Sequence, residues 1–103
     1  MNVPDCLLCR AERLTEWFHE DDTCWIAECT VCATPMVVWK PHSARPPADV
    51  RDRMHALLAE VVAGHFDYVH YVDEHMRQIP DHYHAHARPV GGFFGGPHLR
   101  RRP

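Results

Sequence analysis

Long apolar runs and an excess of positive charge are both missing from this sequence. No apolar stretch approaches the ~20 residues that a helix needs to cross a bilayer. Residues 1–9 contain no basic segment followed by an apolar run, so no signal peptide is expected and a cytoplasmic location is predicted. The formal net charge is -3, whereas a general nucleic-acid binder is usually basic over its surface. Neither a membrane protein nor a nucleic-acid-binding protein is therefore expected.

Lysine is nearly absent, and the number of cysteines is odd, which does not fit a complete disulfide framework. Lys40 is the only lysine, and arginine supplies the other basic charges. Five cysteines cannot all pair with one another. Four of them form two CxxC pairs, Cys6 with Cys9 and Cys29 with Cys32, and this spacing is typical of metal binding in a reducing compartment.

The length of 103 residues is typical of one domain. A domain this small buries only about 60–65% of its unfolded surface, so a bound metal or a dimer interface would add useful stability. No linker is long enough to divide the chain. We expect a single domain over residues 1–98 and a basic tail over residues 99–103.

The pattern of apolar residues predicts an α+β fold. Short β-prone or alternating segments predict five strands. They span residues 17–19, 24–28, 36–40, 67–72 and 79–87. Apolar residues recur at helical spacing over residues 48–66, directly after two prolines. The order β-β-β-α-β-β predicts an antiparallel meander sheet of about five strands with one main covering helix.

Three histidines recur at every second position, His82, His84 and His86. On a strand, alternate side chains share a face, so these imidazoles are predicted to line one surface about 6.5–7 Å apart. Tyr83 and Ala85 would then face the core. The pattern alone leaves three alternatives open: catalysis or ligand binding, a metal-binding face, or a merely polar sheet face.

The surroundings of these histidines resemble the histidine-triad (HIT-like) superfamily. That family alternates histidine with apolar residues and has a Gln four positions before the first histidine, where Gln78 stands here. An acidic turn between two strands at residues 18–27 is also similar, and so is the Lys-Pro-His run that ends at His42. The resemblance covers about residues 5–97.

This resemblance implies a nucleotide-binding hydrolase or nucleotidyl transferase that acts at an α-phosphate through a phosphohistidine intermediate. Within the catalytic triad of His82, His84 and His86, His84 would be the nucleophile and His86 would hydrogen-bond phosphate oxygens or the leaving group. Gln78 and Arg88 would contact phosphate. A backbone carbonyl would hold the proton on the other nitrogen of the nucleophile. Imidazole suits this role because it is a good neutral nucleophile near pH 7.

The resemblance also implies partners, and it leaves a second class of function open. The ligand would be a nucleotide or a nucleoside-phosphate conjugate, and relatives that commonly dimerise imply a homodimer. The alternative is a non-catalytic, zinc-stabilised module of the same fold that binds nucleotide or protein. Asp73 favours this alternative, because the family commonly has an Asn in this region and a negative charge there would repel phosphate.

Two ligand sets are open for a structural zinc ion, and both include Cys6 and Cys9. Spacing alone favours the second CxxC pair as the remaining ligands, because two CxxC pairs at this separation are typical of a zinc ribbon. The resemblance favours His42 and His82. Zinc-bearing relatives, including galactose-1-phosphate uridylyltransferase, combine an N-terminal CxxC with a His after the second hairpin strand and the first His of the triad. Cys24, alone on a strand, is expected in the core.

Overall fold

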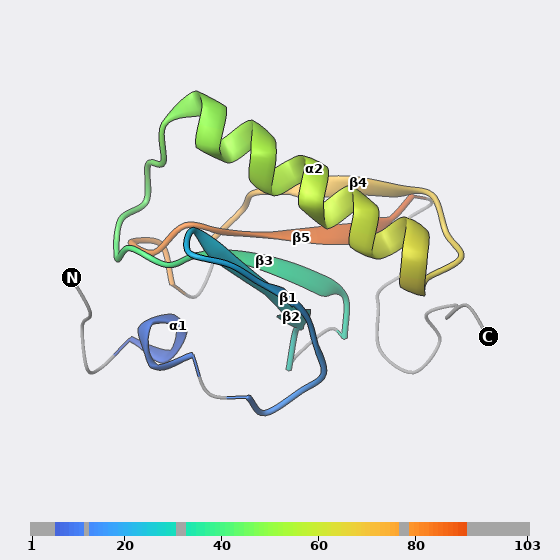
Figure 1. Cartoon of the computed structure of the whole chain (residues 1–103), viewed down its shortest axis with the longest axis horizontal. Helices are drawn as coiled ribbons and strands as arrows, with labels where there is room; N and C mark the ends of the chain where they lie inside the picture. Colours follow the sequence, from blue (N-terminus) through green and yellow to red (C-terminus); the bar gives the residue numbers. More distant parts are fainter. Residues whose placement is uncertain (1–5, 12, 31–32, 77–78, 91–103) are drawn as a thin grey trace.

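The computed structural model describes residues 6–11, 13–30, 33–76 and 79–90. Its elements in chain order are α1 (Leu7–Arg10), β1 (Trp17–Glu20), β2 (Cys24–Glu28), β3 (Pro35–Trp39), α2 (Ala48–His65), β4 (His70–Asp73) and β5 (His84–Pro89). The strands form one antiparallel five-stranded sheet, and α2 covers one of its faces (Figure 1). The prediction of an α+β fold with five strands and one main helix is confirmed.

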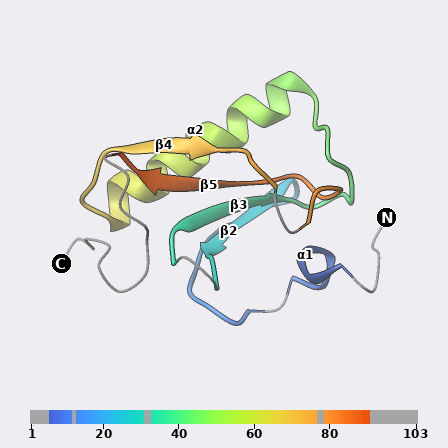
Figure 2. The ribbon, with the colours of Figure 1, turned by 180° about the vertical axis from the view of Figure 1, so that it is seen from behind.

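The strands lie in the order β1-β2-β3-β5-β4, which is not a simple meander. β1, β2 and β3 follow one another as predicted. The chain then crosses the sheet as α2, whose 18 residues span about 27 Å, and returns as the edge strand β4 before β5 enters between β4 and β3 (Figure 2). The predicted meander is therefore wrong for the last two strands, because the long helical crossover carries the chain past the position next to β3.

The two C-terminal strands begin later than predicted. β4 begins at His70 instead of residue 67, and β5 begins at His84 instead of residue 79. Residues 80–82 form a turn that contains Pro80, which has no N–H to give to a sheet. His82 thus precedes the strand that carries His84 and His86, and the prediction that all three share one strand is wrong for His82. The period-two recurrence of histidine includes His82, which is why the pattern extended the strand too far.

α2 packs against the sheet through one apolar stripe. Its buried residues are Met54, Leu58, Val61 and Val62, at spacings of three and four that keep them on one side of a helix. They form a core with the inward side chains of the sheet, among them Cys24, which is fully buried as expected. No described helix has the length and apolar character needed to cross a membrane.

Leu58→Ala is expected to destabilise the fold by about 2–5 kcal/mol, because it leaves a cavity in a fully buried position between helix and sheet. Leu57→Ala is the matched control, since Leu57 is only partly buried against the same core. Urea unfolding of both variants measures the difference. Equal losses would contradict the packing of α2 described above.

The opposite face of the sheet carries the histidines of β5. His84 is the cross-strand partner of Val38, and His86 is the partner of Met36. Directly opposed residues of antiparallel strands share a face, and Val38 belongs to a second buried cluster that includes Leu8 of α1. His84 and His86 therefore lie on the side of α1, away from α2, while Ala85 lies in the core under α2.

Candidate metal centre and histidine site

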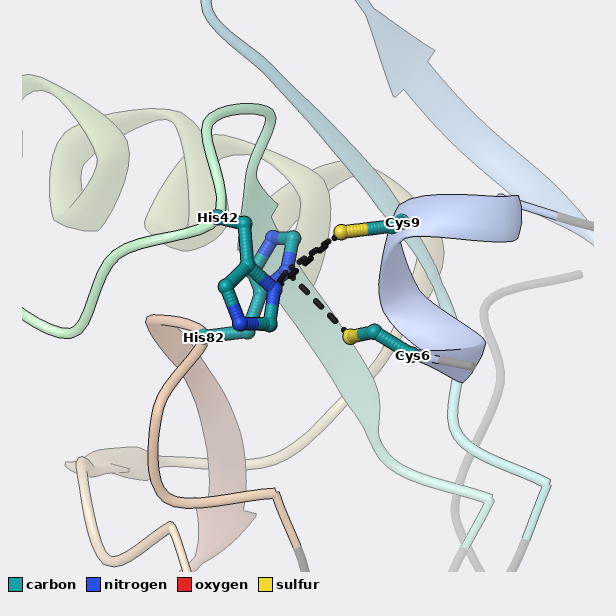
Figure 3. A group of neighbouring side chains, drawn as sticks. All are labelled: Cys6, Cys9, His42 and His82. Atoms are coloured by element: carbon teal, nitrogen blue, oxygen red, sulfur yellow. Dashed lines mark hydrogen bonds between the residues drawn. The ribbon is translucent and has the colours of Figure 1, made fainter. Parts of the chain in front are cut away.

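Four side chains from distant parts of the chain meet beside α1: Cys6, Cys9, His42 and His82 (Figure 3). One ligand atom of each lies within 4.8 Å of all the others. Cys9 Sγ is 3.2 Å from His42 Nδ1 and 3.4 Å from His82 Nδ1. Cys6 Sγ is 3.5 Å from His82 Nδ1, and the two Nδ1 atoms are 3.3 Å apart.

These separations match the edges of a tetrahedron around one ion. Bonds of about 2.3 Å to sulfur and about 2.0–2.1 Å to nitrogen at tetrahedral angles place sulfur and nitrogen about 3.5 Å apart and two nitrogens about 3.4 Å apart. The measured distances of 3.2–3.5 Å are close to both values. The group could therefore bind a metal ion.

The local structure explains why the two sulfurs converge. Cys6 is the N-cap of α1 and Cys9 lies three residues further, so one helical turn places both on the same side. The Arg10 N–H donates to the Cys6 carbonyl oxygen over 3.2 Å, which closes this turn. His42 follows the end of β3, and His82 precedes β5, which pairs with β3. Pairing of β3 with β5 thus brings the two histidines together.

Both histidines are oriented by hydrogen bonds on the ring nitrogen that faces away from the sulfurs. His82 Nε2 lies 2.5 Å from the Trp39 carbonyl oxygen, and His42 Nε2 lies 3.1 Å from Asp81 Oδ2. These oxygens only accept, so each Nε2 carries the proton and each Nδ1 directs a lone pair into the cluster. Histidines that bind metals typically donate their second N–H to a carbonyl or carboxylate in this way.

The electrostatics of the cluster also favour a cation. Two Nδ1 lone pairs that face each other across 3.3 Å are unfavourable unless a proton or a cation lies between them. Burial lowers the pKa of His82, which keeps its ring neutral and able to coordinate. Burial likewise raises the pKa of the Cys6 thiol, so metal binding would release protons from the cluster.

His84 has a defined tautomer because its Nδ1 lies 2.8 Å from the carbonyl oxygen of His82. A carbonyl oxygen can only accept, so the proton is on Nδ1 and the lone pair on Nε2 is left for other chemistry. The rings of His84 and His86 are 5.7 Å apart between centroids and nearly perpendicular. Their exposed fractions are 7% and 8%, so both are almost enclosed.

Two residues, Gln78 and Arg88, are predicted to contact phosphate, and the structure describes only the second. Gln78 lies outside the described residues. Arg88 is described, and its Nε donates to Asp73 Oδ2 over 2.6 Å in an ion pair of which each side chain is mostly covered. Asp73 is the cross-strand partner of His86, so this ion pair lies beside the histidines. The repulsion of phosphate expected from Asp73 is therefore offset by Arg88.

The second CxxC pair is not required to complete the site. Cys32 lies outside the described residues. Cys29 donates its N–H to the Thr34 carbonyl oxygen over 2.8 Å, in the connection between β2 and β3. The two positions that remain beside Cys6 and Cys9 are filled by the two histidines, so the described residues support the histidine-containing set.

In comparisons with known proteins, no family model, no curated protein and no solved structure matches this chain. The resemblance to histidine-triad proteins therefore depends on the residues quoted above alone.

His19, Asp21 and Cys24 form a second group of possible ligands at the turn between β1 and β2. Asp21 already uses both carboxylate oxygens. Oδ1 accepts the N–H groups of Thr23 and Cys24 at 2.7 and 2.9 Å, and Oδ2 lies 2.8 Å from His19 Nε2. The Arg53 guanidinium, 3.5 Å from Oδ2, would repel a cation. This group is better explained as a support for the turn.

Asp21→Asn is expected to lower stability by about 1–3 kcal/mol at pH 7, because the hydrogen bonds of a charged acceptor are weakened. Burial raises the pKa of Asp21, but the hydrogen bonds from His19 and from two backbone N–H groups lower it more, to about 2 instead of 3.8. The folded state thus takes up this proton at lower pH than the unfolded chain does. The stabilisation is present above about pH 4 and is lost as the pH falls to 2. Thermal unfolding of wild type and Asp21→Asn at pH 7 checks the loss, and an unchanged unfolding midpoint in Asp21→Asn would contradict it.

Proposed function

We propose that this protein is a histidine-triad-like nucleotide hydrolase or nucleotidyl transferase whose covalent intermediate forms on His84. A structural zinc ion held by Cys6, Cys9, His42 and His82 would stabilise the fold. The observation that carries the proposal is the hydrogen bond from His84 Nδ1 to the His82 carbonyl oxygen, which leaves Nε2 of a nearly enclosed imidazole unprotonated.

The ligand set supports zinc as the metal. Two thiolates and two imidazoles in a tetrahedral arrangement are typical of structural zinc sites. Sites made only of soft sulfur ligands also suit copper(I), and sites made of oxygen ligands suit magnesium or calcium. All four positions are taken by protein atoms, so no position is left for a substrate or a reactive water. These four residues would hold the ion, which would then join α1 to the segments that carry His42 and His82.

In the proposed reaction, Nε2 of His84 attacks the α-phosphorus of a nucleotide conjugate. The new N–P bond forms as the bond to the leaving group breaks, and the leaving group takes the bonding electrons and a proton from solvent. Water then attacks phosphorus and loses a proton, the N–P bond breaks, and nucleoside monophosphate leaves. In a transferase another acceptor replaces water. A covalent intermediate divides one difficult displacement into two easier ones.

The neighbours of His84 support this step electrostatically. When Nε2 bonds to phosphorus, the ring becomes cationic, and the Nδ1–H bond to the His82 carbonyl becomes a stronger, charge-assisted one. This acceptor is already in place before the reaction, so little reorganisation is needed. His86 lies on the same face and would hydrogen-bond a phosphate oxygen or the leaving group.

Mass spectrometry after incubation with nucleoside phosphoramidates and dinucleotides tests the proposal directly. We expect a peptide containing His84 to carry the added mass of a nucleoside monophosphate. The adduct must disappear in His84→Ala. Turnover without any adduct, or an unchanged adduct in His84→Ala, would exclude this mechanism.

A non-catalytic module that binds nucleotide or protein is the second candidate. The observation that favours it is the ion pair of Arg88 with Asp73, which already occupies the side chain predicted to contact phosphate. Calorimetry separates the two candidates, because a module would bind a nucleoside monophosphate and turn over none of the conjugates. The predicted homodimer remains part of either proposal.

A further inference from the structure

Tyr83 stands between the metal-facing His82 and the proposed nucleophile His84, and its side chain lies on the opposite face, in the core under α2. It is 4% exposed. Its main chain is bonded on both sides: its N–H donates to the Ser43 carbonyl oxygen over 2.7 Å, and its carbonyl oxygen accepts the Trp39 N–H over 3.1 Å. The main chain between the two histidines is therefore held at Tyr83 by hydrogen bonds on both sides.

The hydroxyl of Tyr83 belongs to a group of four polar side chains. It donates to Glu74 Oε2 over 2.7 Å, and His55 Nε2 lies 2.8 Å from the hydroxyl oxygen. Arg51 binds both oxygens of Glu74, at 2.6 and 2.8 Å. Because the hydroxyl proton is given to Glu74, His55 Nε2 must donate to the hydroxyl oxygen. We call Arg51, His55, Glu74 and Tyr83 the tyrosine network.

The tyrosine network has one stable arrangement of protons. Hydrogen bonds from Arg51 lower the pKa of Glu74 to about 2, so Glu74 is ionised at neutral pH. The hydroxyl of Tyr83 lies 2.7 Å from Glu74 Oε2, which as a carboxylate oxygen can only accept, so the phenol carries the proton. A neutral phenol that donates to a charged carboxylate forms one of the stronger hydrogen bonds available to a side chain.

The tyrosine network also closes the loop that leads to the metal centre. Glu74 follows β4 and Tyr83 precedes β5, nine positions later, so their contact holds the two ends of this loop together. The loop contains Asp81, which orients His42, and His82, which faces the cluster directly. Arg51 and His55, one turn apart on α2, attach these loop ends to the helix on the far side of the sheet.

We propose that the tyrosine network is a positioning device that fixes the main chain between His82 and His84. It would thereby set both the direction of the metal-facing imidazole and the tautomer of the nucleophile. This inference rests on the proposed roles of these two histidines. None of its four side chains belongs to the metal cluster, so its effect passes through the backbone of residues 82–84.

Tyr83→Phe and Tyr68→Phe form a matched pair of variants. Tyr68 also packs against the core under α2, and its hydroxyl donates to the Ala87 carbonyl oxygen over 2.9 Å. Each substitution removes one hydroxyl that is bonded near β5 and keeps the ring that fills the core. Ala87, to which the Tyr68 hydroxyl bonds, lies beyond His86 along β5 and away from His82. A general loss of stability should therefore be similar in both variants.

Two measurements on the full chain read the position of the histidines without any substrate. Competition between the protein and a chelator for cobalt(II) or zinc measures metal affinity, which should fall about tenfold in Tyr83→Phe and less than twofold in Tyr68→Phe. Nitrogen-15 NMR of the imidazoles reports the tautomer of His84. Wild type and Tyr68→Phe should show a single Nδ1–H form, and Tyr83→Phe should show a mixture.

Glu74→Gln is the second variant, because it keeps an oxygen that can accept from Tyr83 and removes the negative charge. A shift in the same direction as in Tyr83→Phe supports the proposal. If Tyr83→Phe and Tyr68→Phe have the same metal affinity and the same His84 tautomer, the tyrosine network has no positioning role. Failure of the proposed function is visible separately in wild type, as an absence of metal binding or of the phosphohistidine adduct. The tautomer comparison still decides in that case.

Discussion

Removal of the metal is expected to abolish the cooperative thermal unfolding transition of this domain. Structural zinc contributes about 10–16 kcal/mol of apparent binding free energy in zinc-finger peptides, whereas a whole domain is stable by only about 5–15 kcal/mol. Circular dichroism during heating, with and without a chelator, measures the effect. Element analysis of the purified protein by mass spectrometry identifies the ion.

Cys9→Ser should produce the same loss as the chelator, because Cys9 contacts both cluster histidines. Cys29→Ser is the matched control, since Cys29 is also a partly exposed cysteine and lies outside the cluster. It should keep both the metal and the thermal transition. If Cys29→Ser loses the metal instead, the ligand set of four cysteines is the correct one.

His84→Ala is expected to reduce turnover by at least about a thousandfold, because removal of a covalent nucleophile leaves only binding and electrostatic assistance. The fold and the metal should be retained, since the cluster uses the side chain of His82 and not that of His84. Steady-state kinetics on nucleoside phosphoramidates, together with thermal unfolding, measures both effects.

Three other histidine variants sharpen this prediction. His86→Ala should slow turnover by less, about a hundredfold, because it supports the phosphate without bonding to it. His82→Ala should lower thermal stability as well as activity, because it removes a ligand of the cluster. His75→Ala, at an exposed position, is the control and should behave as wild type. Wild-type hydrolysis by His84→Ala would refute the enzyme proposal.

The sequence predicts those features that depend on neighbouring residues. The helix over residues 48–66 and the alternation of His84, Ala85 and His86 were readable because one period places each side chain on a known face. The pair of Cys6 and Cys9 was also predictable from neighbouring residues, because one helical turn brings the two sulfurs together. His42 and His82 could be paired with it only through the family resemblance, because they lie 40 positions apart.

What the sequence could not predict depends on contacts between distant segments. The insertion of β5 between β3 and β4 follows from the path of α2. Strand order does not change the spacing of polar and apolar residues, so the sequence pattern does not reveal it. His55 looks like an ordinary surface or core histidine, because its partner Tyr83 is 28 positions away. Asp81 had one readable signal, its place directly before a candidate ligand, but its contact with His42 needed the turn at residues 80–82.

The separation of the cluster residues along the chain has a consequence for the unfolded state. Cys6 and His82 lie 76 positions apart, so an ion that joins them closes most of the chain into one ring. A cross-link of that span lowers the conformational entropy of the unfolded chain by an amount worth about 4–5 kcal/mol at 25 °C. An ion bound by this cluster would act as a reversible equivalent of a disulfide between the two ends of the domain. A protease cut in the partly exposed connection between β3 and α2 should therefore leave two fragments that stay together until a chelator is added.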